Sequence, residues 1–435
     1  MTQTHTSLSV GKGLLAISPI IVFLVLYLVT SLIIGDFYKM PISIAMFLAM
    51  VWALTFLQGR SLTDRLNVLT KGASEPNVIF MIWIFILAGI FAAVARYIGA
   101  VEATVNLAIA SLHPSLIVPG LFLITCFISM AIGTSVGTVV ALTPIAVEMA
   151  ADTGGSVPYF VAIVLGGAFF GDNLSFISDT TIAATRTQGC NMKDKFMANL
   201  RIVLPAALLS LIVYCLNAPE ISIEVENVEN KEIWLMVPYL IVIVSAIAGV
   251  NVVLVLILGI FSACLVGICY GNDFLQLAFI SGEGVDSVGG LIIITLMAAG
   301  LLAIIKEAGG IDFILAVLSK NLNSSKGGQL VISLITGLVN LCTANNTVAI
   351  LTVGSVAKDI SSRFAISPKR SASLLDTSSC IVQALIPYGA QSLMAASLSS
   401  LSPVEFWPYL FYPQILAGIL LLTILFSKGN KKELD

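Results

Sequence analysis

Charge is scarce in this chain. Only 10% of its 435 residues are Asp, Glu, Lys or Arg, and 58% are hydrophobic. Soluble proteins carry about 25% charged residues. A soluble globule of this length could not cover its surface with so few charges, and a disordered chain would need more of them. The net charge of −3 also lacks the basic balance that nucleic-acid binding requires.

Histidine is almost absent, since only His5 and His113 occur. Metal sites and acid–base catalysis built on imidazole are therefore disfavoured. Seven cysteines are present, and all but Cys190 lie inside apolar runs. This distribution is typical of small apolar residues within helices and not of a disulfide framework.

Long stretches without charge dominate the chain and predict an all-α polytopic membrane protein. A helix needs about 20 residues to cross a bilayer core. Most of the uncharged stretches fit one crossing, and the stretch 233–272 fits two because it breaks at Gly249–Asn251. Two further stretches have arms that are short for a crossing, so we interpret them as re-entrant hairpins. The uncharged stretches are 13–35, 40–59, 76–95, 103–147, 153–171, 202–219, 233–272, 287–305, 327–357, 377–404 and 406–427.

These stretches predict about ten spans plus two hairpins, which break at Gly133–Ser135 and Asn345–Thr347. The N-terminal run 14–34 is interpreted as the first span because it lacks the pattern of a cleaved signal peptide. If the N-terminus is cytoplasmic, 18 of the 21 Lys and Arg residues fall on the inside. This positive-inside bias predicts that both termini are cytoplasmic, in a membrane of the bacterial inner-membrane type. The bias does not separate a hairpin from two full spans at 115–151 and 328–360.

The two halves of the chain show the same order of features. Segments 86–149 and 297–360 align weakly, and each half has a hairpin followed by a span that carries an Asp. We expect an inverted repeat of two five-span halves, 13–217 and 233–427, joined by an acidic extracytoplasmic linker at 218–232. An odd number of spans per half inverts the second half, and inverted repeats with interrupted helices are typical of secondary transporters.

The strongest local signal lies at 166–181, where GGAFFGDNLSFISDTT interrupts an apolar span. A charged residue in the bilayer centre costs about 2.5–3.5 kcal/mol on insertion scales, so Asp172 needs a function or a partner there. Carboxylate, amide and hydroxyl oxygens suit a hard cation. An Asp in an apolar setting can also exchange a proton for a cation near neutral pH. The structural alternative is that Asp172 or Asp179 caps a half-helix or pairs with Arg186, and either residue could both cap and bind.

Polar groups also occur at the other breaks. In the second half, Asp376, Thr377 and Ser378 stand at what we take to be the place that matches Asp172. Asp376 is close in sequence to Lys369 and Arg370. It could therefore cap a half-helix near the inner surface or bind an ion, and the sequence favours neither role. The hairpin tips carry Thr134 and Ser135 in the first half and Asn345, Asn346 and Thr347 in the second. Such tips can bind a cation through oxygens or an anion through N–H groups.

The run GAFFGDNLSFISDTT resembles the signature of the NhaC-type sodium/proton antiporter family, within the ion-transporter superfamily. The resemblance covers roughly residues 14–427 and implies a Na⁺ site at Asp172, Asn173, Ser175, Ser178, Asp179 and Thr180. Asp172, Asn173, Ser175 and Asp179 are the expected metal ligands among these. Many members have Pro where this chain has Phe176, and the second tip is similar to, but not the same as, Ser-Asn-Thr.

Exchange of Na⁺ for H⁺ is therefore the expected function. The alternative is Na⁺- or H⁺-coupled transport of a small organic acid or amino acid. No Lys or Arg is expected deep in any span, which favours an ion as the substrate. Neither a Gly-x-Gly-Asp element nor His-Glu-x-x-His is present, so we expect no enzyme and no cofactor. The expected partners are the lipid bilayer, Na⁺ and H⁺, without nucleic acid, and a homodimer is left open.

Overall fold

The computed structural model describes residues 10–29, 40–55, 61–111, 113–175, 178–218, 232–318 and 324–427, and all regular elements within them are helical. The first half contains α1 (Val10–Leu24), η1 (Val25–Val29), α3 (Ile42–Leu54), α4 (Leu62–Ala73), α5 (Pro76–Tyr97), α6 (Ala100–Ser111), η2 (Pro114–Leu116), α7 (Ile117–Ile132), α8 (Ser135–Asp152), α9 (Val157–Leu174), α10 (Asp179–Gln188) and α11 (Met192–Leu216). The second half contains η3 (Glu232–Met236), α12 (Val237–Ile247), α13 (Val252–Cys269), α14 (Phe274–Ser287), α15 (Gly289–Glu307), α16 (Gly310–Leu318), α17 (Ser325–Thr343), α18 (Asn346–Arg363), α19 (Pro368–Leu385), α20 (Ala390–Ser399), η4 (Trp407–Tyr409) and α21 (Phe411–Leu425). Most of the linker 218–232, together with Phe176 and Ile177, lies outside the described residues.

The predicted breaks are found where expected. Gly133, between α7 and α8, has a left-handed φ of 75°, and Ala344, between α17 and α18, has a φ of 47°. A left-handed residue ends one helix and redirects the chain, which suits a tight hairpin tip. Since Ala344 carries a Cβ, it occupies a conformation that glycine would adopt more easily. Gly249, between α12 and α13, is left-handed in the same way.

Nine helical stretches among the described residues are long and apolar enough to cross a membrane. Two of them are Pro114–Ile132 and Ser135–Asp152, the arms of the first predicted hairpin, so the expectation that these arms are short for a crossing was wrong. The other seven, with the shorter apolar helices at Ile42–Leu54, Ile233–Ala246 and Phe411–Leu425, coincide with the ten predicted spans. The chain is therefore an integral membrane protein, while the inverted repeat and the hairpins remain predictions.

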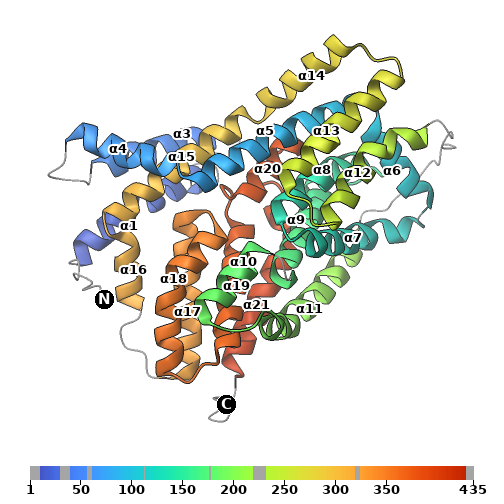
Figure 1. Cartoon of the computed structure of the whole chain (residues 1–435). Coiled ribbons are helices and arrows are strands. Elements are labelled where there is room, and N and C mark those ends of the chain that lie inside the picture. The colour runs from blue at the N-terminus through green and yellow to red at the C-terminus, as the bar shows by residue number, and fades with distance from the viewer. Residues whose placement is uncertain are drawn as a thin grey trace.

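Two interrupted helices form the centre of the protein. Val157–Gln188 contains α9 and α10, and 94% of its apolar 18-residue segment is buried in the protein. Pro368–Ser399 contains α19 and α20, and 78% of the corresponding segment is buried. By contrast, only 33% is buried in Met192–Leu216, where large apolar side chains such as Leu208 and Ile212 are exposed. In Figure 1 the arms α7 and α8 lie on one side of this centre, and α17 and α18 lie on the other.

Helices of the two halves pack across their boundary in exchanged pairs. The first-half helix α8 packs on α20 of the second half, while α18 of the second half packs on α10 of the first. In the same way, α5 packs on α14 and α15 packs on α4. Such exchanged contacts are what two structurally equivalent halves would produce.

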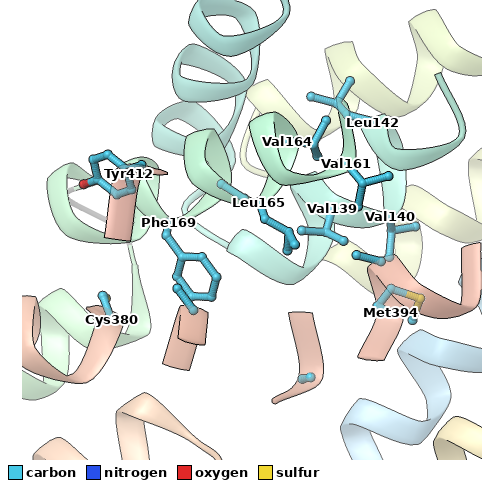
Figure 2. Packing of buried hydrophobic residues seen from close by; sticks show 14 of the residues in the cluster. Val139, Val140, Leu142, Val161, Val164, Leu165, Phe169, Cys380, Met394 and Tyr412 are labelled. Atoms are coloured by element: carbon cyan, nitrogen blue, oxygen red, sulfur yellow. The ribbon is translucent and has the colours of Figure 1, made fainter. Parts of the chain in front are cut away.

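The apolar core around α9 draws on both halves. Figure 2 shows Val139 and Val140 of α8 beside Val161 and Leu165 of α9, with Met394 of α20 next to them. All five side chains are buried. This packing fixes the end of α9, and therefore Asp172, relative to the first hairpin tip.

Candidate functional site

Asp172 lies near the end of α9 and faces the start of α8. Its carboxylate accepts hydrogen bonds from the backbone N–H of Ser135 at 3.0 Å and from the Ser135 hydroxyl at 2.5 Å. Ser135 is the first residue of α8, so the carboxylate also meets the positive end of that helix dipole. Asp172 is only 4% exposed. It therefore caps the start of α8, which is one of the two structural alternatives, and its hydrogen bonds come from Ser135 and not from Arg186.

The polar residues after Asp172 bridge the break between α9 and α10. Ser178 precedes α10, and its hydroxyl lies 2.8 Å from that of Thr180. Thr180 donates to the carbonyl of Asp172 at 3.3 Å. Asp179 begins α10 but is exposed, whereas Asn173, Ser175, Ser178 and Thr180 are buried. Asp179 thus differs in environment from the other expected ligands.

A second buried carboxylate belongs to Asp376 in the middle of α19. The Lys195 ammonium on α11 lies 2.6 Å from its Oδ2, and the Asn199 amide donates to the same oxygen at 2.7 Å. Both ends of the ion pair are almost fully buried, at 1% and 0% exposure. Since α19 begins at Pro368, Asp376 is not a cap near the surface, and Arg370 instead bonds Gln329 and Thr423.

A buried lysine therefore lies at the site, although the sequence led us to expect no Lys or Arg deep in a span. Lys195 stands in the first turns of α11, between the exposed Lys193 and Asp194, but its long side chain turns inward. Its ammonium contacts Asp376, the carbonyl of Asn173 at 2.9 Å and the Thr181 hydroxyl at 2.6 Å. An ammonium has three N–H groups. All three are accounted for by these oxygens, which leaves none for a substrate.

Several buried oxygens around this ion pair have no hydrogen-bond partner. They include Oδ1 of Asp376, Oδ1 of Asn173 and Oδ1 of Asn199, and the hydroxyls of the neighbouring Thr377 and Ser378. Buried polar groups are normally satisfied, so the unpartnered carboxyl and amide oxygens favour a ligand that takes up their lone pairs, while the two hydroxyls can donate or accept. Across the described residues, every buried side-chain atom that lacks a partner is an oxygen.

Two glutamines join the hairpin tips. Gln391 of α20 donates to the Ser135 hydroxyl at 2.8 Å, and Gln383 of α19 donates to the Gln391 carbonyl oxygen at 3.0 Å. Gln383 also donates to the carbonyl of Ala344 at 3.0 Å. The chain of contacts therefore runs from Asp172 through Ser135 to the second tip at Ala344.

The remaining tip residues have separate surroundings. Asn345 caps α18 by accepting from the N–H of Val348 at 3.0 Å, and Asn346 approaches the sulfur of Cys380 at 3.9 Å. Thr134 and Thr347 are half-buried, and Thr134 makes no side-chain cap to α8. None of these four residues contacts the Asp172 carboxylate, whose hydrogen bonds all come from Ser135.

The place that matches Asp172 in the second half is occupied by Gln383 and not by Asp376. Asp172 stands two residues before the end of α9 at Leu174, and Gln383 stands two residues before the end of α19 at Leu385. The contacts agree, because Ser129 donates to the carbonyl of Ala168 and Asn340 donates to that of Ser379 at corresponding points of the two halves. The expectation that Asp376 matches Asp172 was therefore wrong.

Sequence reasoning missed Lys195, Asn199, Gln383 and Gln391. Among the described residues, Asp172, Lys195 and Asp376 are the only charged side chains that are buried. No group of three His, Cys, Asp or Glu side chains that could hold a metal ion occurs in that part of the chain. The site is thus a small charged cluster surrounded by neutral oxygens and amides.

The sequence pattern of the Na⁺/H⁺ antiporter family matches this chain twice, over residues 8–218 and 216–428. The chain belongs to the Na⁺/H⁺ antiporter family. The two matches divide the chain close to the predicted boundary between its halves.

Characterised relatives match along most of their length. The chain is 20% identical to the Malate-2H(+)/Na(+)-lactate antiporter of Bacillus subtilis, over 93% of both chains. It is 23% identical to the Na(+)/H(+) antiporter NhaC of the same organism, over 79% of this chain and 82% of that one. It is 24% identical to the arginine/ornithine antiporter ArcD of Halobacterium salinarum, over 96% of this chain and 92% of that one.

Among solved structures, the YdaH transporter of Alcanivorax borkumensis aligns with a TM-score of 0.40 and 13% identity, covering 83% of this chain and 87% of that one.

Proposed function

We propose that this antiporter exchanges Na⁺ for H⁺, and that Asp172 is the group that carries either ion. Asp376 is neutralised by Lys195, so among the described residues Asp172 is the one buried carboxylate without a basic partner in its hydrogen bonds. A buried lone charge is costly, and a bound proton or a bound Na⁺ removes that cost. The site therefore favours being occupied by one of the two ions.

The observation that carries the proposal is that buried oxygens near Asp376 lack a hydrogen-bond partner, while the nearby Lys195 has no N–H group left to donate. The Oδ1 atoms of Asp376, Asn173 and Asn199 accept no hydrogen bond from the protein, whereas the Lys195 ammonium is saturated by three acceptors. Free acceptors suit a cation, while a carboxylate substrate would need free donors. We propose that the ions pass between the residues expected to form the site. These are Asp172, Asn173, Ser175, Ser178, Asp179 and Thr180, the tip residues Thr134, Ser135, Asn345, Asn346 and Thr347, and Asp376, Thr377 and Ser378.

Coupled transport of an organic acid or amino acid is the second candidate. Lys195 supports it, because a buried ammonium could turn from Asp376 toward a carboxylate in another conformation. The relatives whose names include malate, lactate, arginine and ornithine match over more than nine-tenths of this chain.

In the proposed topology, both termini are cytoplasmic and the second half is inverted.

Transport by the purified protein in proteoliposomes separates the two candidates. An imposed pH gradient should drive uptake of radioactive Na⁺ without any organic solute. A panel of small carboxylates and amino acids should leave that uptake unchanged. Uptake that occurs only in the presence of one organic solute would overturn the exchange of Na⁺ for H⁺ and establish the alternative.

A further inference from the structure

A pocket opens at the tip of the second hairpin. Its walls include Glu75 and Val78 at the start of α5, Thr295 and Leu302 of α15, and Ala344 and Ala390. The volume that the centre of a water molecule can reach inside the pocket is about 50 Å³. One water needs roughly 10–15 Å³ by the same measure. The pocket therefore holds a few waters, enough for a small cation with part of its hydration shell.

The charge of the pocket selects for cations. Among the described residues of its wall, Glu75 is the one carboxylate and no ammonium or guanidinium occurs, and Glu75 is exposed. A single carboxylate in a largely apolar pocket concentrates cations and repels anions. The Tyr388 hydroxyl, also in the wall, is already used because it donates to the carbonyl of Leu341 at 2.6 Å. The wall therefore attracts positive charge without offering a donor from this tyrosine to an anion.

Two side chains connect the wall of this pocket to the partner of Asp172. Ala344, in the pocket wall, accepts a hydrogen bond from Gln383, which in turn donates to Gln391. Gln391 follows the wall residue Ala390 directly and donates to Ser135, the partner of Asp172. The same two amides thus touch the pocket wall on one side and the Asp172 cap on the other.

We propose that this pocket is a vestibule that binds a partly hydrated monovalent cation on its way to Asp172, and that Gln383 and Gln391 form the barrier between them. The inference rests on the proposed function of Asp172. The barrier is neutral, so it can part and close without leaving a charge unpaired. Because Gln383 occupies the place of Asp172 in the second half, the vestibule lies where a second ion site would be if that residue were acidic.

Labelling of a single introduced thiol tests the vestibule. Ala298 lines the pocket from α15, whereas Ile293 on the same helix does not line it and is 53% exposed. In the full-length protein in proteoliposomes, a cationic methanethiosulfonate should modify Ala298→Cys and reduce Na⁺ flux at least about tenfold, because a fixed positive group then occupies the cation route. The same reagent on Ile293→Cys and on the parent chain, which keeps its native cysteines, should leave the flux unchanged.

Two further variants test the charge and the barrier. Glu75→Gln should slow labelling of Ala298→Cys by the cationic reagent and not by a neutral one. Gln391→Ala should speed labelling of Ser135→Cys by about tenfold, the effect of removing the buried hydrogen bond between Gln383 and Gln391, which Ser135→Cys leaves in place.

Full Na⁺ flux after complete labelling of Ala298→Cys would overturn the vestibule, even where the parent exchanges Na⁺ for H⁺. If Ser135→Cys were labelled at the same rate with and without the added Gln391→Ala substitution, Gln391 would not be part of a barrier. A parent chain that moves no Na⁺ would overturn the proposed function itself, and the vestibule as a cation route with it.

Discussion

The ammonium of Lys195 on α11 lies 2.6 Å from Oδ2 of Asp376 on α19, so a buried ion pair joins the two halves of the chain. Oδ1 of the same carboxylate has no hydrogen-bond partner. Removing one member of a buried pair leaves an uncompensated charge, which is more destabilising than never having had the pair. The cluster therefore depends on Lys195 for its stability.

Lys195→Met should lower the stability of the protein by about 3–5 kcal/mol, because Asp376 is left charged and unpaired. Thermal unfolding in detergent measures the loss. Na⁺ should raise the unfolding temperature of this variant more than that of the parent, since a cation can replace the missing ammonium. Lys193→Met changes an exposed lysine of the same helix and is the matched control. Equal unfolding temperatures of the two variants would contradict a structural role for the ion pair.

Asp172→Asn should abolish exchange while leaving the protein folded. The amide keeps the shape of the side chain and can still accept from Ser135, but it can neither titrate nor neutralise Na⁺. Uptake of radioactive Na⁺ into proteoliposomes measures the loss, and thermal unfolding checks the fold. Asp179→Asn changes an exposed carboxylate a few residues away and should weaken the apparent Na⁺ affinity without abolishing transport. Normal sodium exchange by Asp172→Asn would leave this residue as a helix cap only.

Protons and Na⁺ should compete for binding. If one carboxylate takes either ion, protonation at low pH removes the Na⁺ site, so the apparent Na⁺ affinity falls as pH falls. The fall should approach about tenfold per pH unit below the pKa of the site, and saturating Na⁺ should restore binding. Calorimetry in detergent from about pH 6 to 9 measures it. An affinity that ignores pH but rises with one organic acid would instead indicate coupled transport, since linkage between two ligands is reciprocal.

The predicted topology has its own test in thiol accessibility. Lys193→Cys should react only from the cytoplasmic side, and Glu226→Cys, in the linker outside the described residues, only from the other side. Thr134→Cys and Asn346→Cys, at the two tips, should be shielded from both sides, because a re-entrant tip ends within the membrane. Free reaction of Thr134→Cys at the cytoplasmic surface would mean that α7 and α8 are two complete spans.

The breaks of the fold were readable from the sequence, because each is marked by residues that an apolar helix does not tolerate without cause. Gly133 and the polar run after Asp172 mark the ends of α7 and α9 within the expected residues. The importance of Asp172 followed from the cost of its charge in an apolar stretch. These signals are local, so the surrounding residues were enough to interpret them.

The partners of the two carboxylates were not readable. Lys195 sits among Lys193, Asp194 and Asn191, a composition typical of a solvated loop, and only the direction of its side chain brings it to Asp376. Gln383 and Gln391 carry no charge and stand out in no pattern, yet they connect the hairpin tips. Which polar side chain faces which depends on how α11, α19 and α20 pack, and that arrangement is set by contacts distant in sequence.

The ion pair between Lys195 and Asp376 has an electrical consequence. Since the pair is neutral as a whole, the buried cluster presents one net negative charge, that of Asp172. In the proposed exchange, Asp172 carries one proton in one direction and one sodium ion in the other, so each cycle would move equal charge both ways. Such an exchanger would run on concentration differences alone, and the membrane voltage would neither drive nor oppose it.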